Sequence, residues 1–257
     1  MFTVAVSCTG CFQMTTQLKV KADGSGTIDH RMIYSTRALA QMRGLASLRG
    51  GGKPVEIVDP LSEQQARDIV ASLGPGVSYV TSTPIESPGS KGREATYAFN
   101  DVTTLRVSTQ PAAPPGVSLG GQSTASATES VTFTVEHAAG GNTILHIHVP
   151  EPGFLDTLST PQVSGQLGLL KQMLGGAHVL LMVEPEGTLV RTSSPFVEGG
   201  RVTLLDIDLD EILQDETLIP RLQAAKTREE GKEILGKAKG LKINWDRDIT
   251  VEFTPAK

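Results

Sequence analysis

Strict alternation of apolar and polar residues marks the start of the chain as a β-hairpin. Between residues 17 and 34, apolar side chains recur at every second position on both sides of Asp23–Gly24–Ser25–Gly26. Successive side chains of a strand point to opposite faces of a sheet, so a period of two predicts strands with one buried face. The Asp and Gly residues between the two runs favour the tight turn that joins them.

The same period of two recurs through the rest of the chain. Residues 131–149, "VTFTVEHAAGGNTILHIHV", predict a second hairpin that turns at Gly140 and Gly141. Residues 180–192 predict a third, which turns at Glu186–Gly187. Further strands are expected at residues 77–86, 93–100, 201–207 and 249–253.

Apolar positions spaced three or four apart predict helices between these strands. Thr36 is expected to cap a helix that reaches Arg49. Ser62–Glu63–Gln64–Gln65 has the form of a capping box, in which a serine and a glutamine satisfy the first backbone N–H groups of a helix, and Gly74–Pro75 would end that helix. Four more helices are expected at residues 161–174, 209–213, 218–225 and 228–238.

Hairpins interleaved with helices predict an α+β fold with mainly antiparallel sheets and with helices packed on one face. Two α+β halves are expected at residues 12–107 and 130–257, able to share one core. Residues 108–129 are mostly Ser, Thr, Ala, Gly and Pro with almost no charge, which is typical of a flexible linker or a long surface loop.

The composition and net charge argue against nucleic acid as a binding partner. The chain of 257 residues has a net charge of −5, so no basic surface field for nucleic acid is expected. Aromatic residues make up 4% of it, and Trp245 is the only tryptophan, which leaves few rings for stacking bases. No run of 18 apolar residues occurs, so no membrane-spanning helix is expected.

Both cysteines, Cys8 and Cys11, lie in the opening "MFTVAVSCTGCF". A redox pair of this spacing needs a helix after it, which lowers the thiol pKa, but a strand pattern follows here. A zinc site would need a second pair of soft ligands, and no further cysteine exists. Two small buried residues, or a chance disulfide, form a third interpretation.

A fourth interpretation is lipid attachment. Thr9–Gly10–Cys11 resembles the lipobox of bacterial lipoproteins, in which small residues precede the cysteine that receives diacylglycerol. Cys11 would be the lipidated residue, with Cys8 as the alternative. A secretory signal needs a basic start and a longer apolar run than residues 2–6 supply, so we expect residues 1–11 to be the remnant of a signal peptide.

The likeness extends beyond the lipobox. Residues 9–28, with their "DGSG" turn, and the stretch "SPFVEGGRVTLLDIDLDEIL" are similar to uncharacterised bacterial lipoproteins. The resemblance implies a membrane-anchored protein of the cell envelope, whose body faces the periplasm or the exterior. It brings no catalytic residues with it.

His146 and His148 are candidate metal ligands, because residues two apart on a strand share a face. The same alternation places Leu145, Ile147 and Val149 on the buried face, so a solvated polar face for the histidines is the simpler interpretation. Likewise "DIDLDE" resembles a calcium loop but has Glu211 where that loop needs glycine. Asp208 is instead expected to cap a short helix.

These patterns favour a lipid-anchored envelope protein without enzymatic activity or cofactor, which binds a partner protein or an apolar ligand. An envelope enzyme or metal protein built on His146 and His148 is the first alternative. A cytoplasmic redox protein using Cys8 and Cys11 is the second.

Overall fold

The computed structural model describes residues 12–40, 59, 61–109, 130–138, 140–151 and 176–256. It confirms the predicted α+β class, with mainly antiparallel sheets and few helices. Of the expected linker at 108–129, Ser108 ends a short strand, and residues 110–129 lie outside the described residues. The expected helix at 161–174, Cys8 and Cys11 also lie outside them.

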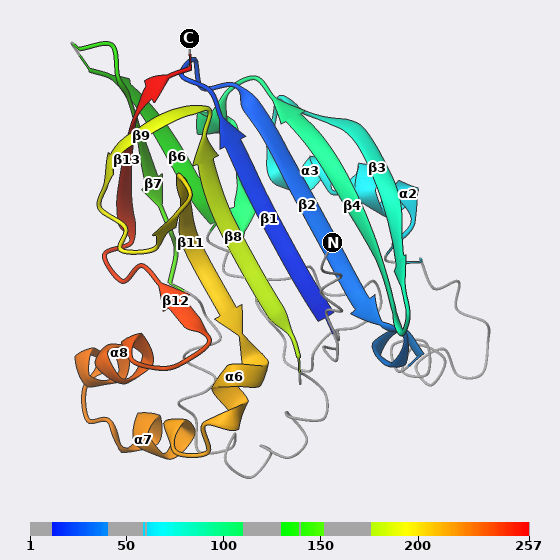
Figure 1. Cartoon of the computed structure of the whole chain (residues 1–257), viewed down its shortest axis with the longest axis vertical. Coiled ribbons are helices and arrows are strands. Elements are labelled where there is room, and N and C mark those ends of the chain that lie inside the picture. The colour runs from blue at the N-terminus through cyan, green and yellow to red at the C-terminus, as the bar shows by residue number, and fades with distance from the viewer. Residues whose placement is uncertain are drawn as a thin grey trace, which may run out of the picture.

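The larger sheet crosses the front of the molecule in Figure 1 and contains strands from both halves of the sequence. Its central strands, β1 and β8, run parallel to each other, whereas the other described pairs in this sheet are antiparallel. β12 pairs with β11 off the main path. In spatial order the strands are β10 (Val197–Glu198), β11 (Arg201–Asp208), β8 (His178–Pro185), β1 (Phe12–Val20), β2 (Gly26–Ser35), β4 (Ser90–Phe99) and β3 (Val77–Ser87), with β12 at Leu241–Ile243.

A second, antiparallel sheet lies behind the upper left of the first in Figure 1. Its strands in spatial order are β5 (Val107–Ser108), β6 (Ser130–His137), β7 (Thr143–His148), β13 (Asp248–Pro255) and β9 (Gly187–Thr192). The sheets share one apolar core, because residues of both belong to a single buried cluster. Fully buried members include Leu18, Ile28, Leu145, Val183 and Val251.

Helices cover the rear and one end of the larger sheet. α2 (Glu63–Asp68) and α3 (Val70–Leu73) lie behind β3 and β4, where the Tyr97 hydroxyl donates to the Ala66 carbonyl over 2.8 Å. α6 (Leu209–Gln214), α7 (Leu218–Ala224) and α8 (Arg228–Gly236) lie at the lower left of Figure 1. A 3-10 turn spans Val102–Thr104.

The predicted hairpins at both glycine-rich turns are confirmed. β1 pairs with β2 from Phe12–Tyr34 to Val20–Gly26, and Gly24 has a φ of +82°, which glycine adopts without strain. β6 pairs with β7 from Thr132–His148 to His137–Thr143. The capping box is also confirmed in part, since the Ser62 hydroxyl accepts a hydrogen bond from the Gln65 N–H over 3.1 Å.

Two details of the prediction are wrong. The helix that begins at residue 36 is capped by Ser35 and not by Thr36, because the Ser35 hydroxyl accepts from the Ala38 N–H over 3.1 Å. Residues 180–192 form no hairpin: β8 and β9 belong to different sheets. The reason is that β1 and β11 already occupy both edges of β8, which leaves no backbone groups there for β9.

The chain crosses between the sheets at Glu186 and Gly187. The Glu186 N–H donates to the Val20 carbonyl over 2.7 Å, which ties the crossing point to β1. Gly187 then runs so close to β13 that a Cβ on it would lie 2.1 Å from the Thr254 carbonyl oxygen. Only glycine fits at this position without moving backbone.

Gly187→Ala is therefore expected to lower the free energy of unfolding by about 1–3 kcal/mol, the usual cost of forcing an extra methyl group into a packed site. Urea unfolding followed by far-UV circular dichroism measures the change. Gly140→Ala is the control, because a Cβ there meets nothing within 4 Å. Equal stability of the two variants would contradict the close approach of β9 and β13.

Candidate functional site

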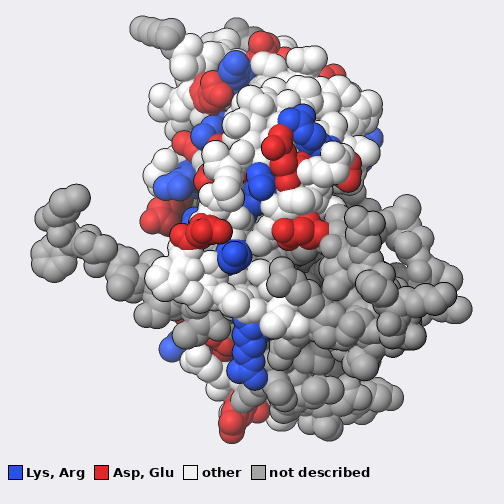
Figure 2. Space-filling view, turned by 90° about the vertical axis from the view of Figure 1, so that its right-hand side faces the viewer, with Lys and Arg blue, Asp and Glu red and all other residues white. Residues whose placement is uncertain are grey.

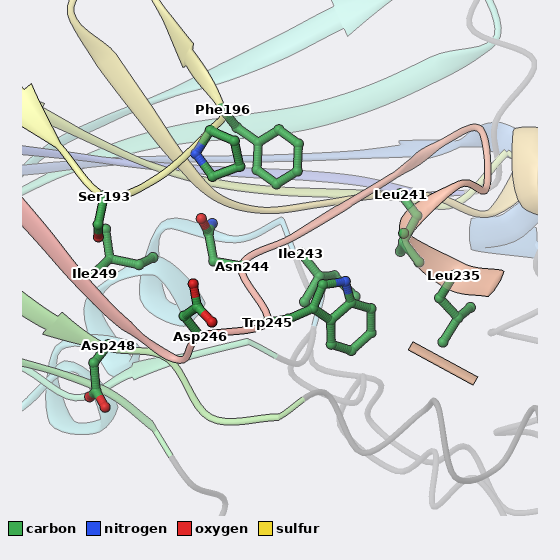
Figure 3. A pocket seen from close by; sticks show the side chains of 12 residues that line it. Ser193, Phe196, Leu235, Leu241, Ile243, Asn244, Trp245, Asp246, Asp248 and Ile249 are labelled. Carbon is green, nitrogen blue, oxygen red and sulfur yellow. The ribbon is translucent and has the colours of Figure 1, made fainter. Parts of the chain in front are cut away.

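A pocket of about 340 Å³ opens where the ends of the two sheets meet α8. Four segments form it: the β9–β10 connection, the last turn of α8, β12, and the loop that leads into β13 (Figure 3). Most of the lining is apolar, and Leu235, Leu241, Ile243 and Ile249 are buried core residues. The described lining residues are Ser193, Pro195, Phe196, Leu235, Gly236, Leu241, Ile243, Asn244, Trp245, Asp246, Asp248 and Ile249.

Asn244 fixes the loop that carries the tryptophan. β11 shifts register between Thr203 and Leu205, which frees carbonyl groups from the ladder. The buried Asn244 amide donates to the Thr203 and Leu204 carbonyls over 3.0 and 3.1 Å. An unpaired buried carbonyl costs about 1–3 kcal/mol, so this side chain holds the loop against β11.

The loop then turns sharply at Arg247, whose φ is +54°. A left-handed conformation costs a residue with a Cβ roughly 1–2 kcal/mol, so surrounding contacts must stabilise it. The Arg247 N–H donates to the Asn244 carbonyl over 3.3 Å, and its carbonyl accepts from the Val149 N–H over 2.7 Å. The first bond closes the turn, and the second attaches the loop to the residue after β7. Trp245 then contacts α8 at Lys232 and Gly236.

Trp245 forms one wall of the pocket beside Ile243 (Figure 3). The Lys232 ammonium lies 5.8 Å from the centroid of its ring, a cation–π contact. Gly236 makes room for the indole, since a Cβ at that position would lie 3.6 Å from the indole nitrogen. The indole is partly exposed and packs against the core on one side.

His148, one of the two predicted metal ligands, lies beside this pocket. Its Nδ1 is 2.7 Å from an Asp248 carboxylate oxygen, and its Nε2 is 3.3 Å from the Arg247 guanidinium. Sequence reasoning missed Asp248 as a neighbour of His148, because the contact depends on β13 pairing with β7. Asp248 therefore connects the polar face of β7 to the pocket lining.

His146 lies on the same face of β7 but pairs with a different carboxylate. Its Nε2 is 3.4 Å from a Glu136 oxygen, although Glu136 pairs with Ile144 in the β6–β7 ladder and not with His146. Leu145, Ile147 and Val149 are buried, as predicted. Within the described ranges no group of three or more His, Cys, Asp or Glu residues is placed to hold a metal, and metal binding by His146 and His148 stays a prediction.

The acidic run at residues 206–211 has separate structural partners. Asp208 caps α6, as predicted, accepting from the N–H groups of Asp210 and Glu211. Asp210 accepts from the Gly176 N–H over 2.7 Å. Asp206 lies between His178 at 2.8 Å and the Lys242 ammonium at 2.9 Å.

The contacts among His178, Asp206 and Lys242 change the pKa of His178 and of Asp206. The hydrogen bond to Asp206 raises the pKa of His178, although burial opposes the positive charge. Burial of Asp206 opposes its negative charge, but hydrogen bonds from His178 and Lys242 outweigh it and lower its pKa. By contrast, burial lowers the pKa of His30 to about 4, with Thr16 at 2.9 Å from its Nδ1.

Away from the pocket, acidic and basic side chains are mixed on the surface of the protein. Figure 2 shows the face at the right of Figure 1, where acidic and basic side chains alternate. The Arg67–Glu63 pair on α2, at 2.6 Å, and the Lys91–Glu86 pair of the β3–β4 hairpin, at 3.6 Å, are of this mixed kind. In the part of the chain that the structure describes, no helix is both long and apolar enough to cross a membrane.

Comparisons with known proteins add little to this geometry. No protein-family model matches the chain, and no curated protein matches it. Among solved structures, the chain is similar to the NMR structure of the folded domain of LppM from Mycobacterium tuberculosis. The two are 10% identical with a TM-score of 0.34, over 96% of this chain and 92% of that domain. A likeness of this degree carries no argument about function.

The pKa shift of His178 predicts a pH dependence. A raised pKa in the folded state stabilises the fold below about pH 6.5, the value for an unperturbed histidine, and this contribution is lost as pH rises through the folded-state pKa. We expect the unfolding free energy of wild type to exceed that of His178→Gln by more at pH 6 than at pH 8.5.

NMR titration of the histidine ring protons provides a direct measurement. The His178 resonance should titrate above its ordinary pKa in wild type and move back toward that value in Asp206→Asn. An unchanged His178 titration in Asp206→Asn would show that the contact at 2.8 Å does not cause the shift.

Proposed function

We propose that the protein is a lipid-anchored binding module of the bacterial cell envelope, which holds a small apolar or amphipathic molecule in the pocket at Trp245. The pocket itself is the observation that carries the proposal. Its volume lies at the lower end of the range of about 300–1,000 Å³ typical of small-molecule sites. Such sites combine apolar walls with a few fixed polar groups, as this one does.

The polar groups of the pocket support binding more than chemistry. The Asn244 amide is engaged with the Thr203 and Leu204 carbonyls. The Ser193 hydroxyl accepts from the Thr250 N–H over 3.0 Å, and Asp248 pairs with His148. These groups shape the cavity, while most of its lining is apolar, with leucine, isoleucine, phenylalanine, proline and tryptophan among the lining residues.

The proposed lipid anchor is inferred from the sequence around Cys11. Thr9–Gly10–Cys11 fits the lipobox, and Phe12, the next residue, is the first of β1. The Phe12 ring packs against Tyr34 on β2, with ring centroids 5.0 Å apart. A diacylglycerol on Cys11 would thus attach directly to the larger sheet, and its two acyl chains would supply the two hydrophobic signals that stable anchoring requires.

Membrane fractionation of the native host tests the anchor. We expect Cys11→Ser, introduced at the genomic locus, to move the protein from the membrane fraction to the soluble fraction and to abolish labelling by an alkyne-tagged fatty acid. Cys8→Ser is the matched control and should behave as wild type. If Cys8→Ser abolishes membrane association and labelling but Cys11→Ser does not, the lipid is attached to Cys8. If both variants keep membrane association and labelling, the proposed lipid anchor is contradicted.

The pocket is tested by the fluorescence of Trp245, the only tryptophan in the chain. Titration with 1-decanol should shift the emission in a saturable way, because the apolar chain replaces water next to the indole. Gly236→Leu should abolish saturation by filling the space beside the ring. A Cβ at this position makes an ordinary contact at 3.6 Å with the indole nitrogen, and far-UV circular dichroism checks that the leucine variant is folded.

Gly231→Leu is the matched control, because it lies on the same helix and a Cβ there meets nothing within 4 Å. It should bind 1-decanol as wild type does. Saturable binding that is equal in wild type and Gly236→Leu would place the alcohol elsewhere and contradict the proposed site.

A further inference from the structure

The charged groups that line the pocket are of one sign. Asp246 and Asp248 line it, whereas the described lining residues include no Lys, Arg or His. A ligand that is apolar throughout would bring no counter-charge to these carboxylates. A positively charged group would be attracted to them, and more strongly near the low-dielectric protein surface than in bulk water.

The two carboxylates differ in what they already contact. Asp248 lies 2.7 Å from His148, and in Figure 3 it sits apart from the other lining side chains. Asp246 lies nearer the middle of the pocket, between Ile249 on one side and Trp245 on the other (Figure 3). Among the described residues, no hydrogen bond or ion pair engages the Asp246 carboxylate, so it is available to a ligand.

Trp245 adds a second feature suited to a cation. The negative face of an indole attracts positive charge, and tryptophan is the strongest of the aromatic residues in this respect. The Lys232 ammonium, 5.8 Å from the ring centroid, already makes such a contact with this ring, so the positive group of a ligand is expected at Asp246 and not over the indole. Asp246 and Trp245 are adjacent in sequence, and both line the pocket.

We propose that the pocket selects a cationic amphiphile: a molecule whose apolar body lies against Leu241, Ile243 and Trp245 and whose positive group pairs with Asp246. This inference rests on the proposed function and specifies its ligand class. The apolar walls contribute most of the binding free energy. The Asp246 carboxylate determines the selectivity among ligands of equal chain length. Because Asp246 is exposed, the expected preference is modest, up to about fivefold in affinity at low salt.

Three probes with the same ten-carbon chain and different heads test the selection: decyltrimethylammonium, 1-decanol and decyl sulfate, each below its critical micelle concentration. Trp245 fluorescence reports their binding to the full chain. We expect the affinity to be highest for the cation and lowest for the anion. Raising the ionic strength to about 1 M, where the Debye length is about 3 Å, should remove the difference.

Asp246→Asn should remove the preference for the cation and leave binding of 1-decanol unchanged. Asp68→Asn on α2 is the matched control: it makes the same change in net charge far from the pocket, so it separates local recognition from general attraction to an acidic protein. Far-UV circular dichroism checks that both variants are folded.

The possible outcomes separate the two proposals. If none of the three probes binds saturably, the proposed binding function and this inference are both overturned. Equal affinity for all three, a preference for decyl sulfate, or a cation preference retained in Asp246→Asn would overturn the inference and leave the binding function standing. A cation preference lost in Asp246→Asn and kept in Asp68→Asn would support both.

Discussion

The parallel pairing of β1 with β8 is the interaction on which the rest of the fold depends. It joins segments about 165 positions apart, from Gln13–His178 to Val20–Pro185, and so builds the larger sheet from both halves of the sequence. A parallel pair cannot close through a tight turn, so the intervening chain is free to form the β3–β4 hairpin and the β6–β7 hairpin. With β11 on its other edge, β8 is buried at the centre of this sheet.

This pairing also determines where the pocket forms. Because β8 has no free edge, the chain leaves it at Glu186 and enters the second sheet as β9, against β13. It then returns to the first sheet as β10 and β11. The connection that makes this return, residues 193–196, closes one side of the pocket, and the loop from β12 to β13 closes another. The cavity thus lies where the chain passes twice between the sheets.

The sequence predicted the local elements well, because these depend on near neighbours. The hairpin at "ADGSGT" and the cap at Asp208 follow from turn chemistry and from one side chain near the backbone it bonds. The helices α6, α7 and α8 were also predicted. In α7 the buried Leu218 and Leu222 lie four positions apart, which is helical spacing, whereas the buried residue of α8 is Leu235. Strand alternation correctly placed Leu145 and Ile147 in the core.

Contacts between distant segments were beyond that reasoning. The Glu186–Gly187 dipeptide has the composition of a hairpin turn, and only the partners of β8 show that it is a crossing between sheets. Asp248 could be placed beside His148 only once β13 was known to pair with β7. β12, three residues long, is too short for a period of two to stand out, yet it brings Ile243 and Asn244 to the pocket.

The strongest physical support for a binding function lies in how polar and apolar groups are distributed at this site. The protein pairs its polar groups closely: Asn244 bonds two carbonyls of an irregular strand, His148 meets Asp248, and Asp206 lies between His178 and Lys242. Apolar surface that stays in contact with water forgoes roughly 25 cal/mol for each Å² left uncovered. A ligand that covers the Trp245 pocket recovers that free energy and stabilises the folded state in proportion to its concentration over its Kd. The loop around Arg247, with its left-handed backbone, is the part of the site most dependent on neighbouring contacts, so its stability and ligand affinity should be coupled.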